Sequence, residues 1–164
     1  MMNPNQPDLK ELFDGLNSYL VNGYVSELSP EDPAKDAFDY LNALYLNNQH
    51  EGLVFCRLIL ESETLYNDFL RATCLSYLLL SESSRQYAFS FLLENSKTLS
   101  IPVLKEAIFY FYCAKNETEP HHLPDGLFKK IMERYQMVKN DPDAIFYHLY
   151  ETYNDFVKAY SLDD

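Results

Sequence analysis

The chain has 164 residues, a formal net charge of −12 and 47% hydrophobic residues. A chain of this length can bury a core without disulfides or metals, and its hydrophobic content argues against disorder despite the charge. Only four glycines are present, too few for the turns of a β-sandwich or barrel. We therefore expect a single all-α domain over residues 1–164. Its helices, about eight in number, should form antiparallel pairs in a right-handed curl like that of HEAT or armadillo repeats, or a compact helical bundle.

The negative charge is concentrated at the two ends of the chain. Residues 1–56 hold nine acidic and two basic residues, a net charge of −7, and residues 116–164 hold ten and five, a net charge of −5. Residues 57–115 hold six of each and are neutral. Such a field repels nucleic acid and anionic membrane surfaces and attracts basic partners. The first residues do not form a secretion signal, and the three cysteines lack disulfide spacing, so we expect a cytoplasmic protein.

Apolar residues recur at helical spacing along the chain and predict the helices in order. Capping residues and prolines mark where several of them begin, as at Asp32-Pro33, Ser100, Asp125 and Asp141-Pro142. The helices are expected at about residues 8–22, 32–46, 51–60, 65–80, 84–92, 100–112, 125–135 and 141–160.

The stretch Leu65–Leu80 is apolar on more than one helical face. A helix of this kind is buried on several sides or spans a membrane. The run is too short to span a bilayer, which needs about 20 mostly apolar residues, and Asp68 and Arg71 interrupt it. We therefore expect a central helix with other helices packed against it.

A shift of 34 residues aligns two consecutive predicted helix pairs. A repeated helix pair is the unit of an α-solenoid, although two amphipathic hairpins can also align by chance. The tetratricopeptide signature is absent, which favours a HEAT-like or armadillo-like build. The aligned residues are Phe55 with Phe89, Leu58 with Leu92, Ile59 with Leu93, Thr64 with Thr98, Leu65 with Leu99, Leu70 with Leu104, Arg71 with Lys105 and Tyr77 with Phe111.

No pattern typical of catalysis or cofactor binding is present. The chain lacks a Gly-x-Ser-x-Gly elbow and a glycine-rich phosphate loop. His121 and His122, with Glu117 and Glu119 before them, are candidate metal ligands, but an exposed polar loop explains them as well. We therefore expect no catalytic, cofactor-binding or metal-ligating residues, no cofactor, and a protein that is not an enzyme.

The first candidate partner-binding surface lies on the second helix and the turn before it. Glu31, Asp32, Asp36 and Asp39 place carboxylates beside Tyr40. Tyrosine supplies contact area with a hydrogen-bonding tip, and carboxylates pair with Arg and Lys across an interface. The alternative is a solvated helix face, with charges that favour the helix N-terminus.

The second candidate surface lies on the last predicted helix. Tyr147, Glu151 and Asp155 are spaced by four and are expected to form one stripe, with Asp143 near its start. The apolar side of the same helix, from Ile145 to Val157, is expected to pack inward. The same two interpretations apply: a docking face, or a solvated helix surface.

The small size, acidity, tyrosine-rich helices and helical-repeat build of the chain resemble the immunity proteins of bacterial polymorphic toxin and contact-dependent growth inhibition systems. The resemblance is one of general character over the whole chain, and it assigns no residue. It implies a protein that binds and neutralises one cognate toxin, a basic nuclease domain, by covering its active site. Because of the negative charge we also expect no nucleic-acid or membrane partner, and we favour a monomer over an oligomer.

Two other functions remain open. A helical-repeat adaptor or secretion chaperone would hold an amphipathic peptide in a concave groove. A helical enzyme with an unrecognised site would require convergent polar residues in a buried pocket.

Overall fold

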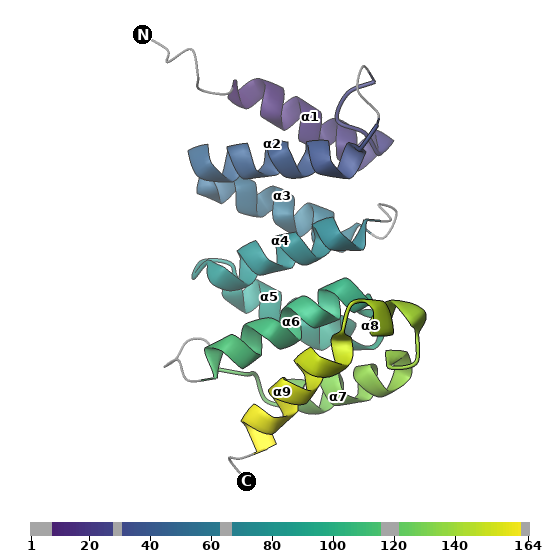
Figure 1. Cartoon of the computed structure of the whole chain (residues 1–164). Coiled ribbons are helices and arrows are strands. Elements are labelled where there is room, and N and C mark those ends of the chain that lie inside the picture. Colours follow the sequence, from purple (N-terminus) through teal and green to yellow (C-terminus); the bar gives the residue numbers. More distant parts are fainter. Residues whose placement is uncertain (1–7, 28–30, 63–66, 116–121, 162–164) are drawn as a thin grey trace. The chain divides into compact units, whose positions relative to one another are not determined.

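Figure 1 shows the computed structural model of the chain, which describes residues 8–27, 31–62, 67–115 and 122–161. Every regular element formed by these residues is helical, which confirms the all-α prediction. Packing divides the chain into two compact units, Met1–Cys74 (unit 1) and Leu75–Asp164 (unit 2), which we describe separately. The prediction of a single domain stays a prediction. The elements are α1 (Leu9–Asn22), α2 (Pro33–Asn47), α3 (Gln49–Glu61), α4 (Asp68–Leu80), α5 (Arg85–Asn95), the 3-10 turn η1 (Ser96–Thr98), α6 (Ile101–Ala114), α7 (Leu127–Val138), α8 (Pro142–Phe146) and α9 (Leu149–Ser161).

Side-chain caps set several helix starts where the sequence predicted them. Asp8 accepts a hydrogen bond from the backbone N–H of Lys10 at 3.0 Å and begins α1. Asp32 accepts from the backbone N–H of Lys35 at 3.1 Å and begins α2, and Ser100 caps α6 in the same way. These caps satisfy N–H groups that have no partner inside the helix.

Asp125 does not cap α7. The helix begins one residue later than predicted, at Leu127, with Gly126 in the cap position and no side-chain cap hydrogen bond. The predicted cap at Asp125 is therefore wrong, because a glycine without a side chain occupies the position that the carboxylate would need.

The predicted helix over residues 141–160 is two helices, α8 and α9. Between them, His148 has a φ of 57°, in the left-handed region that non-glycine residues seldom adopt. No glycine or proline marks this bend in the sequence. The predicted stripe that joined Tyr147 to Glu151 and Asp155 on one helix is therefore wrong.

In unit 1, α2 packs against both α1 and α3 (Figure 1). The single residue Asn48 joins α2 to α3, and its side chain accepts a hydrogen bond from the backbone N–H of Glu51 at 3.2 Å. Gly52 allows the close approach of these helices, because a Cβ there would lie 2.7 Å from the Cα of Tyr45. The fully buried core residues of this unit include Leu16, Leu41, Leu44, Cys56, Leu60 and Cys74.

Arginine side chains close the C-terminal ends of two helices. Arg71 donates to the carbonyl of Leu60 at 3.0 and 2.8 Å, at the end of α3. In unit 2, the buried Arg85 donates to the carbonyls of Leu79 at 2.9 Å and Leu80 at 3.3 Å, at the end of α4. The last carbonyls of a helix lack partners and carry its negative dipole end, so both cations stabilise the turns that follow.

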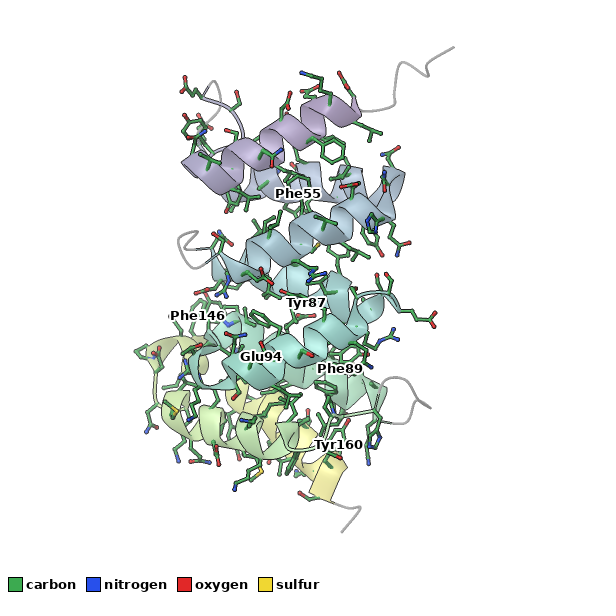
Figure 2. The ribbon with its side chains drawn as sticks, turned by 180° about the vertical axis from the view of Figure 1, so that it is seen from behind. Phe55, Tyr87, Phe89, Glu94, Phe146 and Tyr160 are labelled. Atoms are coloured by element: carbon green, nitrogen blue, oxygen red, sulfur yellow. The ribbon has the colours of Figure 1, made fainter. Side chains whose placement is uncertain are left out.

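In unit 2, α6 packs against α7 and α9. Tyr135 of α7 stacks on Tyr153 of α9 with ring centroids 3.7 Å apart. Tyr160 lies near the end of α9 (Figure 2). Its hydroxyl donates a hydrogen bond to the carbonyl of Phe111 at 2.8 Å. Burial raises the pKa of Tyr160 to about 12, so this hydroxyl keeps its proton at neutral pH. Tyrosines therefore hold α9 in place with both ring contacts and hydrogen bonds.

The 34-residue offset is present in the helix positions. Shifted by this offset, α3 covers residues 83–95 and α4 covers residues 102–114, close to the observed α5 and α6. Burial at positions related by the offset does not match throughout. Leu58 is 44% exposed, whereas its counterpart Leu92 is fully buried. The curl predicted for the whole chain stays a prediction.

Helix α4 crosses the boundary between the units and is less buried than predicted. Its expected start at Leu65 lies outside the described residues. Phe69 and Leu80 are 54% and 64% exposed, so one side of the helix is open. None of the described helices has the length and apolarity needed to span a bilayer. The buried residues of α4 are Leu70, Ala72, Cys74, Leu75, Leu78 and Leu79.

Leu70→Asp is expected to unfold unit 1, because Leu70 is only 4% exposed and a buried carboxylate without a partner is strongly destabilising. The expected loss exceeds about 3 kcal/mol. The matched control is Phe69→Asp, at a neighbouring position that is 54% exposed, and it should keep the fold. Thermal melting followed by circular dichroism measures both, and a Leu70→Asp protein that melts like the wild type would contradict the assignment of Leu70 to the core.

Candidate functional site

The first predicted surface is completed by a residue of α1. The hydroxyl of Tyr40 donates a hydrogen bond to Oε1 of Glu11 at 3.3 Å. The Tyr40 ring lies over Gly15, where a Cβ would overlap the ring. Burial, the Glu11 carboxylate and Asp36 raise the pKa of Tyr40, so its hydroxyl stays protonated and can donate. We call Glu11, Asp36 and Tyr40 the Tyr40 cluster.

Sequence reasoning found Asp36 and Tyr40 but missed Glu11. Glu11 belongs to another helix, 29 residues away from Tyr40. Its contact with Tyr40 depends on how α1 and α2 pack, and neither sequence periodicity nor residue spacing reports that. Gly15, inside an otherwise regular helical pattern, is the one available signal, because such a glycine often marks a close approach.

Other predicted acids on this surface interact within α2. Asp32 caps the helix through the backbone N–H of Lys35, and Oδ2 of Asp39 lies 2.9 Å from Nζ of Lys35. Glu31 is exposed just before the cap. The carboxylates that flank Tyr40 are thus Glu11 and Asp36, whereas Asp32 and Asp39 have structural partners.

An open hollow lies beside the Tyr40 cluster in unit 1. Three carboxylates line it, of which Asp14 lies 3.1 Å from Nζ of Lys10 and Asp8 caps α1. Acidic side chains around a hollow open to solvent suit a basic side chain of a partner better than a buried substrate. The lining residues are Asp8, Lys10, Glu11, Asp14, Gly15, Val25, Ser26 and Tyr40.

The second predicted surface is divided by the bend at His148. Asp143 lies exposed in the first turn of α8. Tyr147 ends that helix, and its carbonyl accepts a hydrogen bond from Nζ of Lys105 on α6 at 2.6 Å. Glu151 and Asp155 are exposed one turn apart on α9. The structure therefore keeps Glu151 and Asp155 together on α9 and separates them from Asp143 and Tyr147.

Ile145 and Phe146 face solvent, against the prediction that they pack inward. They are 68% and 72% exposed, whereas Leu149 and Phe156 beyond the bend are fully buried as predicted. The bend at His148 is the physical reason, because residues before it do not continue the buried stripe of α9. Figure 2 shows Phe146 at the outer edge of unit 2. We call Asp143, Ile145, Phe146, His148, Tyr150 and Glu151 the α8–α9 corner.

Chemistry that would support catalysis is not evident among the described residues. They contain no cluster of three His, Cys, Asp or Glu side chains that could hold a metal ion. Of the candidate metal ligands considered in the sequence, Glu117, Glu119 and His121 lie outside the described residues, and His122 is exposed. Burial raises the pKa of the Cys74 thiol well above its usual value, so this cysteine is a protonated core residue rather than a nucleophile.

Comparison with known proteins assigns no function to either candidate surface. No protein-family model matches the chain, and no curated protein matches it either. The function has to be argued from the geometry and charge of the described residues.

His148→Gly and His148→Val test the strain at the corner. Glycine adopts a positive φ without steric cost, so His148→Gly should change the free energy of unfolding by less than about 1 kcal/mol. The β-branched valine resists this conformation, and His148→Val should lower stability by roughly 1–2 kcal/mol. Urea unfolding of both variants gives the comparison. Equal stability of the two would show that His148 does not hold the left-handed conformation in solution.

Proposed function

We propose that this chain is a non-enzymatic acidic binding protein whose partner is a basic protein. The Tyr40 cluster is the observation that carries the proposal. It combines an aromatic side chain with two carboxylates from different helices, in a part of the chain where residues 1–56 carry a net charge of −7. Tyrosine and charge-assisted hydrogen bonds to Arg or Lys are typical of protein interfaces.

The resemblance to immunity proteins extends this proposal to a partner class. The partner would be a cognate toxin domain, a basic nuclease whose groove normally holds phosphate. Carboxylates placed where phosphates would lie cover the active site, speed association and favour the correct partner. In this form, the chain neutralises the toxin by binding it.

A second hollow in unit 1 favours the alternative of a helical-repeat adaptor or secretion chaperone. It lies between α2 and the start of α4, and it includes Phe38 and Phe69, which are 38% and 54% exposed. An apolar side chain of a bound peptide would contact these two exposed rings. Binding of this kind would depend on the two phenylalanines and little on salt. The lining residues are Asp32, Ala34, Lys35, Phe38, Asn67, Phe69, Leu70 and Thr73.

The proposal is tested by capturing the partner from the native host, identifying it, and measuring its affinity for charge-reversal variants. Glu11→Lys combined with Asp36→Lys should weaken binding at least about tenfold and reduce its salt dependence. The matched control reverses Glu82 and Glu94, which are exposed carboxylates in the charge-neutral middle of the chain. This control changes the net charge by the same amount and should have a much smaller effect on affinity for the partner.

Two outcomes would contradict the proposal. If neither charge reversal changes affinity or its salt dependence, acidic recognition is wrong. If Phe38→Ala and Phe69→Ala abolish binding while the Glu11 and Asp36 reversal does not, the adaptor alternative replaces it.

A further inference from the structure

Three large side chains with apolar surface are exposed within residues 145–150. Ile145, Phe146 and Tyr150 are 68%, 72% and 62% exposed, although Leu149 in the same stretch is fully buried. Single exposed apolar residues are ordinary, whereas a contiguous exposed apolar patch is typical of an interaction site. Aromatic side chains are also the commonest anchors of protein interfaces. This stretch is therefore the strongest candidate for an apolar contact in unit 2.

The backbone that carries these side chains is fixed from several directions. The carbonyl of Tyr147 accepts a hydrogen bond from Nζ of Lys105 at 2.6 Å. The backbone N–H of Tyr147 donates to the carbonyl of Asp143 at 2.9 Å. The N–H of His148 donates to the carbonyl of Ile145 at 3.2 Å. The positive φ of His148 persists because these contacts hold it. A fixed presentation lowers the conformational entropy lost on binding.

The ring of Phe146 contacts the ring of the next residue. It meets the ring of Tyr147 edge-on, with centroids 4.9 Å apart and an interplanar angle of 89°. Phe146 is thus oriented by its neighbour while most of its surface remains exposed. It has the properties of an anchor side chain.

The formal charges of this stretch are all negative. Residues 141–155 contain four carboxylates and no Lys or Arg; of these, Asp141 caps α8 and Oε1 of Glu151 lies 3.6 Å from Nδ1 of His148. The nearest basic residues along the chain are Lys139 before the stretch and Lys158 after it, and the Lys105 ammonium of α6, which donates to the Tyr147 carbonyl, adds one positive charge at the corner. An exposed apolar contact in a stretch whose formal charges are carboxylates is complementary to an apolar surface that carries Lys or Arg.

A second copy of this chain is a poor occupant of the corner. A symmetric dimer places the same patch on both sides of its interface, so the carboxylates of one copy would face those of the other. Like charges in opposition disfavour association. A cationic amphipathic helix fits better, because its apolar stripe is narrow and its flanking positions carry the positive charge.

We infer that the α8–α9 corner docks a cationic amphipathic helix of a protein partner, with Phe146 as the anchor and Asp143 and Glu151 pairing with the flanking Lys or Arg side chains. The inference rests on the proposed function in one respect, that the partner is basic. It goes further by naming the contact element and a second surface.

The probe is a synthetic helical peptide of about 18 residues, made of Leu and Lys in amphipathic order with one Trp. The chain contains no Trp, so Trp emission reports on the peptide alone. We expect the wild-type protein to bind it and Phe146→Ala to weaken binding roughly tenfold or more. Asp143→Lys combined with Glu151→Lys should also weaken it. Met137→Ala is the matched control, because Met137 is 66% exposed in the same unit but outside the corner.

The peptide affinities of these variants distinguish this inference from the proposed function. Circular dichroism of each variant confirms that the fold is retained, as expected for an exposed side chain. Absence of binding to the wild type, equal affinity of Phe146→Ala and Met137→Ala, or equal binding of a Leu and Glu peptide would each overturn the inference. Peptide binding lost on reversal of Glu11 and Asp36 but kept in Phe146→Ala would support the Tyr40 cluster and overturn the role of the corner.

Discussion

The close approach of α2 to its two neighbours is the constraint on which unit 1 and its candidate surface depend. Gly15 on α1 leaves room for the Tyr40 ring, and Gly52 on α3 leaves room for the backbone at Tyr45. A glycine inside a helix costs about 0.5–1 kcal/mol relative to alanine. Here that cost is offset by packing, and at Gly15 the same packing brings Tyr40 within hydrogen-bond distance of Glu11. A structural constraint between helices thus creates the polar cluster that we propose to meet a partner.

Much of the fold follows from local chemistry and could be predicted from the sequence. Asp8, Asp32 and Ser100 cap their helices through their own side chains, and these caps act within three residues of the chain. The bend at His148 could not be predicted in this way. It depends on contacts such as that of Lys105 with the Tyr147 carbonyl, which joins residues 42 positions apart. Local residue pattern reports helix ends that a residue's own side chain makes, and fails at ends that tertiary contacts impose.

The two candidate surfaces show the same difference between features that local sequence predicts and features that helix packing decides. Asp36 and Tyr40 were predicted from their spacing on one helix, whereas Glu11 required knowledge of how two helices pack. At the other end of the chain, the acids were predicted correctly as exposed, but the exposure of Phe146 was not, because its direction is set by the bend. Charge pattern therefore identified the two acidic regions and Tyr40, whereas only the structure shows that Glu11 joins Tyr40 and that Phe146 is exposed in the second region.

Both surfaces combine a fixed aromatic side chain with carboxylates, which is a physical basis for recognising a basic protein. Carboxylates supply long-range attraction and discrimination, and the aromatic group supplies buried contact area once the partner has arrived. The most direct test of this account is amide hydrogen exchange of the chain with and without its captured partner. The account predicts slowed exchange in α1 and α2 around Tyr40 and in residues 143–151 at the α8–α9 corner. Slowed exchange confined to the charge-neutral residues 57–115 would contradict it.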